Sequence, residues 1–127
     1  MRLITKLTWE WAIRCFGAEH VDNIPVRALR TAEEAVELSQ VCGIPKEMMH
    51  KLVDIVYSRP KGSFDSEVGG LMLTTACLAA SCGGREPQDL FENELRRVLA
   101  KPIEHFAVRN QEKIAMGLTL DAGLFKG

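Results

Sequence analysis

The chain has 127 residues, which is enough for one domain but too few for two. Its 16 basic and 17 acidic residues leave a formal net charge of −1, so we expect neither nucleic acid nor a membrane as a partner. The longest apolar stretch, from Val68 to Ala80, is shorter than the roughly 20 residues that a membrane-spanning helix needs.

The start of the chain shows no signal-peptide pattern, and the cysteines form neither a CxxC pair nor a cluster with zinc spacing. We therefore expect a cytoplasmic protein with reduced thiols. The four cysteines are Cys15, Cys42, Cys77 and Cys82.

Helical patterns separated by glycine and proline cover most of the chain, whereas strand patterns are weak. The expected fold is an all-α bundle of about five helices, in a single domain over residues 1–127. Helices are predicted over residues 4–16, 25–42, 46–57, 63–81, 87–99 and 103–116.

Four details of this prediction concern the connections. Residues 18–24 are predicted to form a loop. Either Ser63 or Asp65 can cap the fourth helix, and Pro102 either kinks the last helix or separates two helices. The tail, residues 117–127, has no clear period, so we expect it to be mobile or packed on a partner.

The fourth predicted helix is unusual because it is apolar on all sides. Between Val68 and Ala80, only two glycines and two threonines interrupt the apolar residues. Such a helix has to be covered on every side, which a bundle of this size can barely achieve alone. We therefore expect a homo-oligomer, a dimer or a tetramer, with this helix at its centre.

The second predicted helix carries a pair of acids. Glu34 and Glu37 lie about 60° apart on neighbouring turns, with Arg30 in the same sector and Leu38 at its border. Two carboxylates placed in this way repel each other unless a cation lies between them, and oxygen ligands favour Mg²⁺ or Mn²⁺. The alternative interpretation is a pair of ordinary surface glutamates.

A further acid, Glu67, lies at the start of the apolar fourth helix. It either stabilises the helix dipole and has no other role, or it completes the carboxylate cluster if the second and fourth helices pack together.

Together these segments resemble a known family. Residues 27–40 contain EExxE, and EVGG at residues 67–70 opens a later, apolar helix. The MazG-like all-α nucleoside triphosphate pyrophosphohydrolases have a similar pattern, with EExxE on one helix and ExxD on the next long one. Two further segments look like family features: the aromatic first helix from Trp9 to Gly17, and Asn110 followed by Lys113. The resemblance extends over residues 9–113.

The resemblance implies an activity and a metal site. Members convert a nucleoside triphosphate to the monophosphate and pyrophosphate, and their carboxylates bind the Mg²⁺ that holds the phosphates and the attacking water. On this basis Glu34, Glu37 and Glu67 are the expected catalytic residues and metal ligands, and Glu33 orients its neighbours.

The chain departs from the family pattern at Gly70, which stands where ExxD has its aspartate. Loss of this ligand weakens metal binding or abolishes turnover, unless another acid takes its place. The acids considered as replacements are Asp54, Asp65, Glu92 and Glu94. The alternative function is therefore a catalytically impaired MazG-like module that binds nucleotides or a partner.

A triphosphate also needs cations besides the metal. Arg30 shares the glutamate face, Asn110 and Lys113 match the family pattern, and Trp11 is expected near the pocket, where it can stack on a base. The complete set of expected substrate-binding residues is Trp11, Arg30, Lys101, Arg109, Asn110 and Lys113. Arg27, Arg59 and Lys61 are further basic candidates.

Two other interpretations compete with these. A plain helical scaffold would make the acidic clusters coincidental, and it does not explain why acids lie beside apolar residues in two separate helices. A helix-turn-helix DNA-binding protein is disfavoured, because the chain lacks a basic recognition helix.

Overall fold

The computed structural model describes residues 1–127, and it confirms the all-α prediction. Seven α-helices and one short 3₁₀ turn are present, without any strand. Their bounds are α1 Leu3–Phe16, α2 Ala18–Val21, α3 Ile24–Val41, α4 Lys46–Tyr57, α5 Phe64–Ser81, α6 Pro87–Leu99, α7 Ile103–Ala115 and η1 Ala122–Leu124.

Local capping explains where the two longest helices begin. Asn23 Oδ1 accepts a hydrogen bond from the backbone N–H of Val26 at 3.2 Å, at the start of α3. Ser63 Oγ accepts one from the backbone N–H of Ser66 at 3.2 Å, at the start of α5. Ser63 and not Asp65 is therefore the cap of α5, which resolves the alternative that the sequence left open.

The structure corrects one predicted connection and resolves another. Residues 18–24 are not entirely a loop, because residues 18–21 form the helical turn α2 after Gly17, whose φ of 86° favours glycine. At Pro102 the chain is extended, with φ −61° and ψ 143°, so a new helix starts there. The last pattern therefore contains two helices, not one kinked helix.

The tail packs against its own chain. The side-chain amide of Asn23 donates to the carbonyl oxygen of Leu120 at 3.0 Å. The rings of Phe64 and Phe125 meet edge to face, with their centroids 6.0 Å apart. These contacts place Leu120 and Phe125 of the tail at the starts of α3 and α5. Mobility of the tail, or its packing on a partner, stays a prediction.

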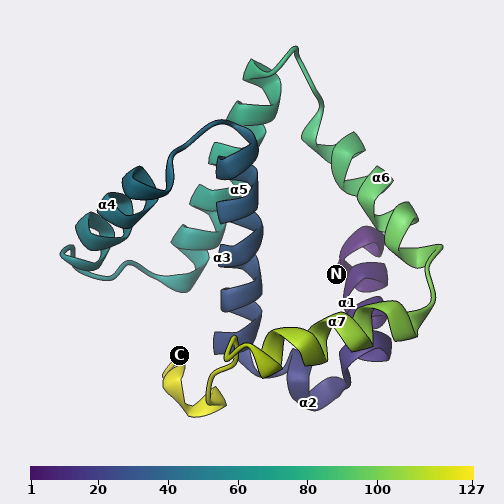
Figure 1. Cartoon of the computed structure of the whole chain (residues 1–127). Helices are drawn as coiled ribbons and strands as arrows, with labels where there is room; N and C mark the ends of the chain where they lie inside the picture. Colours follow the sequence, from purple (N-terminus) through teal and green to yellow (C-terminus); the bar gives the residue numbers. More distant parts are fainter.

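The helices form two groups with a gap between them (Figure 1). In this view α3 and α5 stand at the centre with α4 projecting to the left, whereas α6 descends on the right to α1 and α7. A small core forms where α1, α6 and α7 meet, and its buried members are Cys15, Leu95, Val98 and Phe106.

The other group has almost no core of its own. Neither α4 nor α5 contains a buried residue, and α4 packs closely against no other helix. The apolar pattern of α5 thus remains largely exposed within a single chain. Its packing partner, and the expected MazG-like bundle with an oligomeric core, remain predictions.

Candidate functional site

A cleft of about 370 Å³ opens between α3 on one side and α1, α6 and α7 on the other, and we call it the α3–α7 cleft. Four helices supply its lining, so residues far apart in sequence meet there. The lining residues are Thr8, Trp11 and Phe16 from α1, Arg27, Arg30, Glu33 and Glu34 from α3, Phe91, Glu94, Leu95, Arg97 and Val98 from α6, and Phe106, Arg109, Asn110 and Lys113 from α7.

Two arginines of α3 are partly buried in this cleft. The Arg27 guanidinium lies over the Phe16 ring, 5.1 Å from its centroid, and Arg30 Nη2 donates to Asn110 Oδ1 at 3.4 Å. Arg27 Nε and Arg30 Nη1 are buried and have no acceptor in the protein. Burial first, and then the charge of Arg30, lower the pKa of Arg27. Two guanidinium nitrogens of residues that line the cleft thus lack an acceptor within the protein.

The wall formed by α7 carries polar and basic groups on one face. Asn110 and Lys113 are three residues apart, and Arg109 precedes them, so all three reach the cleft. Lys113 Nζ forms an ion pair with Glu33 Oε1 at 3.0 Å. This pair and the contact between Arg30 and Asn110 connect α3 to α7 across the cleft.

The acids of α3 lie at the same cleft. Glu34 remains partly open to solvent, but loss of hydration is the largest cause that raises the pKa of its carboxyl group. The nearby charges of Glu37, Glu33 and Glu94 raise the pKa further, and Lys113 opposes them. The site therefore disfavours the ionised form of Glu34.

Two charged residues of α6 complete the cleft: Arg97, which sequence reasoning did not single out, and Glu94, which it considered only as a replacement for the missing aspartate. Arg97 donates hydrogen bonds to the Glu94 carboxylate, and this bond is the main cause that lowers the pKa of Glu94. Glu94 was one of four acids considered as a replacement for the missing aspartate, and only this one lines the cleft. Leu95, the residue after Glu94, is buried, so this side of α6 faces the other helices.

Five of the six expected substrate-binding residues line this cleft, but the expected set of metal ligands does not come together there. Trp11, Arg30, Arg109, Asn110 and Lys113 line the cleft together with Glu34. Trp11 also packs edge to face against Phe16 and Phe106, so it belongs partly to the core. Lys101 does not line the cleft, although its charge contributes to lowering the pKa of Glu94.

Glu67 lies elsewhere in the single chain. Its carboxylate lies so close to Gly62, in the loop before α5, that a Cβ at Gly62 would overlap Glu67 Oε1. Glu67 is also not among the charges that shift the pKa of Glu34. No three acids, histidines or cysteines are grouped closely enough to hold a metal ion. The three-glutamate ligand set expected from the family pattern is therefore not assembled within one chain.

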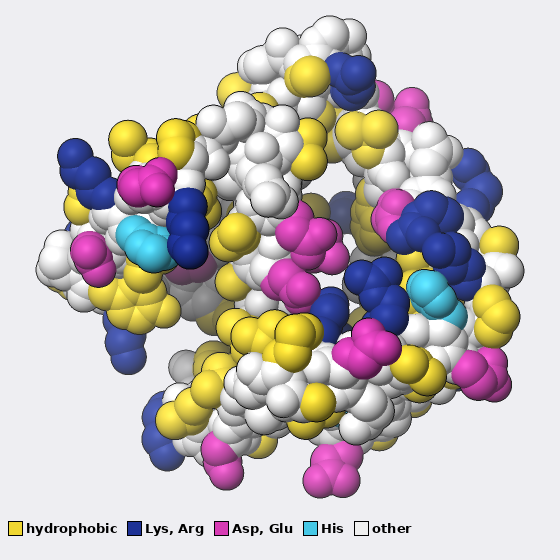
Figure 2. Space-filling model, in the orientation of Figure 1, with side chains coloured by type: hydrophobic (Ala, Val, Ile, Leu, Met, Phe, Trp, Pro, Cys, Tyr) yellow, Lys and Arg dark blue, Asp and Glu magenta, His cyan; other side chains and the backbone are white.

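The surface shows the same separation of charge. In Figure 2, acidic side chains on the α3 column face a hollow, and basic side chains occupy its opposite side, over α6 and α7. A ligand that enters this hollow meets both acidic and basic groups of α3 on one side and mainly basic groups of α6 and α7 on the other.

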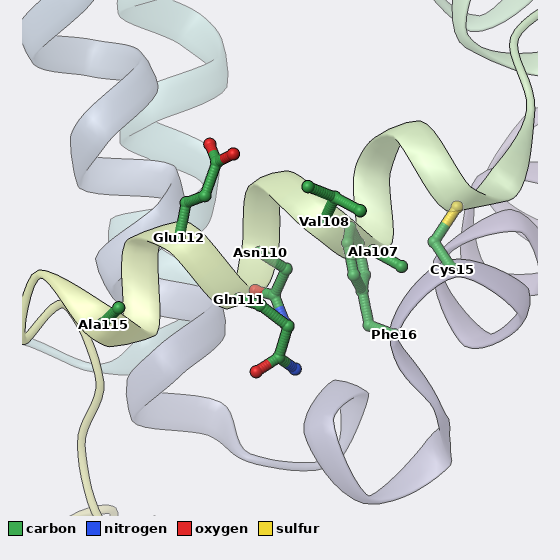
Figure 3. A pocket seen from close by; sticks show the side chains of 8 residues that line it. All are labelled: Cys15, Phe16, Ala107, Val108, Asn110, Gln111, Glu112 and Ala115. Atoms are coloured by element: carbon green, nitrogen blue, oxygen red, sulfur yellow. The ribbon is translucent and has the colours of Figure 1, made fainter.

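A second pocket, of about 480 Å³, opens between α1 and α7 (Figure 3). Asn110 and Gln111 point into it from α7, with Phe16 and Cys15 from α1, whereas Glu112 points away. No lysine or arginine lines it. This pocket lacks cationic groups for binding a phosphate, so the α3–α7 cleft is the candidate site.

The chain matches no protein-family model, no curated protein and no solved structure. None of its helices combines the length and hydropathy needed to cross a membrane.

Proposed function

We propose that this chain is a MazG-like, Mg²⁺-dependent nucleoside triphosphate pyrophosphohydrolase. It takes an NTP or dNTP, and water cleaves the bond between the α- and β-phosphate groups to give the monophosphate and pyrophosphate. The resemblance of the EExxE segment supports the reaction class, and the α3–α7 cleft supports the polyphosphate substrate. All four cysteines are free thiols, which supports a cytoplasmic location within the same proposal.

The observation that carries the proposal is the pair of unpartnered guanidinium nitrogens in the cleft, Arg27 Nε and Arg30 Nη1. A buried donor without an acceptor costs about 1–3 kcal/mol. Phosphate oxygens are acceptors that match the geometry of a guanidinium group. Arg109 and Lys113 line the same cleft from α7, so a chain of phosphates is matched by cations on both walls.

The remaining residues receive roles from their positions. Glu34 accepts a proton from the attacking water, because its raised pKa makes it a better base than an ordinary surface carboxylate. Asn110 orients Arg30 through their hydrogen bond. Trp11 lines the cleft, where its aromatic ring can stack on a base. When bound, Mg²⁺ or Mn²⁺ would neutralise phosphate charge.

A second candidate function is a nucleotide-binding module without turnover. One observation favours it: Glu67 lies against Gly62 and does not join Glu34, while Gly70 supplies no carboxylate. In such a protein Arg30, Arg109 and Lys113 would still bind a triphosphate, and the acids of the cleft would only balance the positive charge of these side chains.

The deciding experiment measures pyrophosphate release from a panel of NTPs and dNTPs with Mg²⁺, Mn²⁺ or a chelator. Metal-dependent release with the monophosphate as co-product supports the enzyme. Binding of a nonhydrolysable triphosphate analogue, detected by calorimetry, without release from any substrate supports the second candidate. Neither binding nor release in folded protein would contradict both.

A matched pair of variants tests the cleft itself. Arg30→Gln should lower kcat/KM about 10- to 150-fold, which corresponds to the roughly 1.5–3 kcal/mol of a hydrogen bond to a charged group. Arg59→Gln removes the same charge from an exposed loop position outside the cleft, and should change kcat/KM less than about 2-fold. Equal effects of the two substitutions would argue against the cleft as the substrate site.

A further inference from the structure

The basic side chains of the α3–α7 cleft differ in whether an acceptor of the protein already binds them. Two arginine nitrogens of α3 are buried without any acceptor. Arg97 instead binds the carboxylate of Glu94, which precedes it by one turn of α6. Lys113 of α7 binds the carboxylate of Glu33, which belongs to the opposite wall of the cleft.

The ion pair between Lys113 and Glu33 is different from the other two ion pairs of the chain. Its residues are 80 positions apart, whereas each of the other pairs joins residues three or four positions apart on one helix. Its side chains are 22% and 30% exposed, and those of the other pairs are at least 42% exposed. Water and salt therefore screen this pair less than the others, and helix packing, not helical spacing, brings it together.

A phosphate group that reaches Lys113 meets this carboxylate. The three N–H donors of the ammonium group can contact two anions. A phosphate oxygen bound to Lys113 Nζ would, however, lie within about 6 Å of Glu33 Oε1, because both oxygens are then hydrogen-bonded to one nitrogen. Like charges at this separation repel each other, more strongly where water is partly excluded. The charge of Glu33 also acts within the cleft, since it helps to raise the pKa of Glu34.

We propose that Glu33 holds the place of a phosphate at Lys113 in the ligand-free cleft and is displaced when a triphosphate binds. The two arginine nitrogens without an acceptor make the first contacts with the phosphates, and Lys113 joins them after its carboxylate leaves. Each binding event therefore includes the loss of one ion pair, so Glu33 lowers the affinity of the cleft. This inference rests on the proposed function, because it takes the α3–α7 cleft as the triphosphate site.

The alternative role of Glu33 is structural, as a contact that only holds α3 against α7. The two roles predict opposite effects on binding. If the contact is structural, its removal loosens the cleft and weakens both folding and binding. If Glu33 competes with phosphate, its removal lowers the melting temperature of the free protein but strengthens the binding of the ligand.

The test measures the binding of inorganic tripolyphosphate to the full chain by calorimetry, with a chelator present so that no metal ion takes part. Glu33→Gln should bind tripolyphosphate about 2- to 5-fold more tightly than the wild-type protein, a change that matches the upper part of the range measured for partly exposed ion pairs. Its melting temperature without ligand should be lower. Unchanged or weaker binding by Glu33→Gln would overturn the inference.

A matched control separates this effect from a general loss of negative charge. Glu112 adjoins Lys113 in α7, but it forms no ion pair and does not line the cleft. Glu112→Gln removes the same charge as Glu33→Gln and should change the affinity less than about 1.5-fold, because exposed charges are screened by salt. Equal tightening by the two substitutions would contradict a specific competition at Lys113.

A double-mutant cycle tests the ion pair itself. Lys113→Met removes the cation and should weaken the binding of tripolyphosphate. In this background Glu33→Gln should change the affinity less than about 1.5-fold, because the pair that it breaks is already absent. The same tightening in both backgrounds would show that Glu33 acts without Lys113, which contradicts the exchange of partners.

Failure of this inference can be distinguished from failure of the proposed function. If the wild-type protein binds tripolyphosphate but Glu33→Gln binds it no more tightly, only the role of Glu33 is wrong. If neither protein binds tripolyphosphate while both are folded, the α3–α7 cleft is not a polyphosphate site, and both proposals are wrong.

Discussion

Glu34 illustrates at the scale of one residue how position changes chemistry. The cleft raises the pKa of its carboxyl group, first through loss of hydration and then through the charge of Glu37. The folded state therefore holds the Glu34 proton to a higher pH than the unfolded chain, whose glutamates titrate near about 4.3. The stabilising contribution of Glu34 is therefore present at low pH and is lost as the pH rises through the raised pKa of the folded state. At neutral pH the ionised carboxylate lowers the free energy of unfolding.

We expect Glu34→Gln to raise the free energy of unfolding at pH 7 by about 0.2–0.5 kcal/mol, the size of a like-charge repulsion between neighbouring helical turns. The same change should reduce turnover at least about 100-fold, because the proton acceptor is lost. Urea denaturation and the pyrophosphate assay measure the two effects.

Glu67→Gln is the matched control for this variant, since Glu67 lies outside the cleft in the single chain. If turnover is lost in Glu67→Gln but preserved in Glu34→Gln, the assignment of the acids derived from the cleft is wrong.

His20 gives a second prediction at this scale. Its pKa is lowered, mainly by burial and then by the charges of Arg27 and Arg30, and its Nε2 has no hydrogen-bond partner. The unfolded chain therefore protonates His20 at a higher pH than the folded protein does. The stabilisation of the folded state is complete above about pH 6.5 and is lost as the pH falls through the lowered pKa of His20. The free energy of unfolding should therefore decrease between pH 7.5 and pH 5.5.

His20→Gln should flatten this decrease, whereas His50→Gln, at an exposed position of α4, should leave it unchanged. Urea denaturation at the two pH values measures both. The same pH dependence in wild-type protein and in His20→Gln would exclude His20 as its source.

At the scale of one helix, the start of α5 shows how capping works. Ser63 and Asp65 are both suitable residues, but the Ser63 hydroxyl is the one that accepts the N–H of Ser66. Ser63→Ala should therefore lower the free energy of unfolding by about 1 kcal/mol. Asp65→Ala removes only a favourable charge from the first turn and should cost about 0.3–1 kcal/mol at low salt, less at high salt. Thermal unfolding at two salt concentrations distinguishes the two, and a salt-sensitive Ser63→Ala effect would contradict the capping role.

At the scale of the whole molecule, the open arrangement of the single chain leads to a prediction about thiol reactivity. Cys77, in the middle of α5, is exposed within one chain. The homo-oligomer expected from the apolar sequence of this helix would cover Cys77, so Cys77 should react with a thiol reagent more slowly than Cys42, which is exposed beyond the end of α3. Mass spectrometry of labelled peptides measures both rates, and 6 M urea serves as the control in which the difference should disappear. Fast labelling of Cys77 in the native protein would argue against an oligomer with α5 at its centre.

Most helices could be predicted from the sequence because the residues that begin and end them lie next to them in the chain. Glycine and proline mark most helix ends, and α4 and α6 have the predicted bounds. The turn α2 was missed because four residues are too few to show a helical period. The position of the tail was also not predictable, since it depends on contacts of Leu120 and Phe125 with residues about 60–100 positions away.

The sequence by itself determined the helical class, the approximate bounds of six of the seven helices, and the types of residue available for phosphate chemistry. Only the tertiary structure decided which of them meet: Arg30 with Asn110, Lys113 with Glu33, and Glu94 rather than Glu67 near Glu34. The reason is physical. Helical periodicity places residues three or four apart on one face, but the angle and order in which helices pack depend on side chains distant in the sequence, and these decide whether two carboxylates share a site.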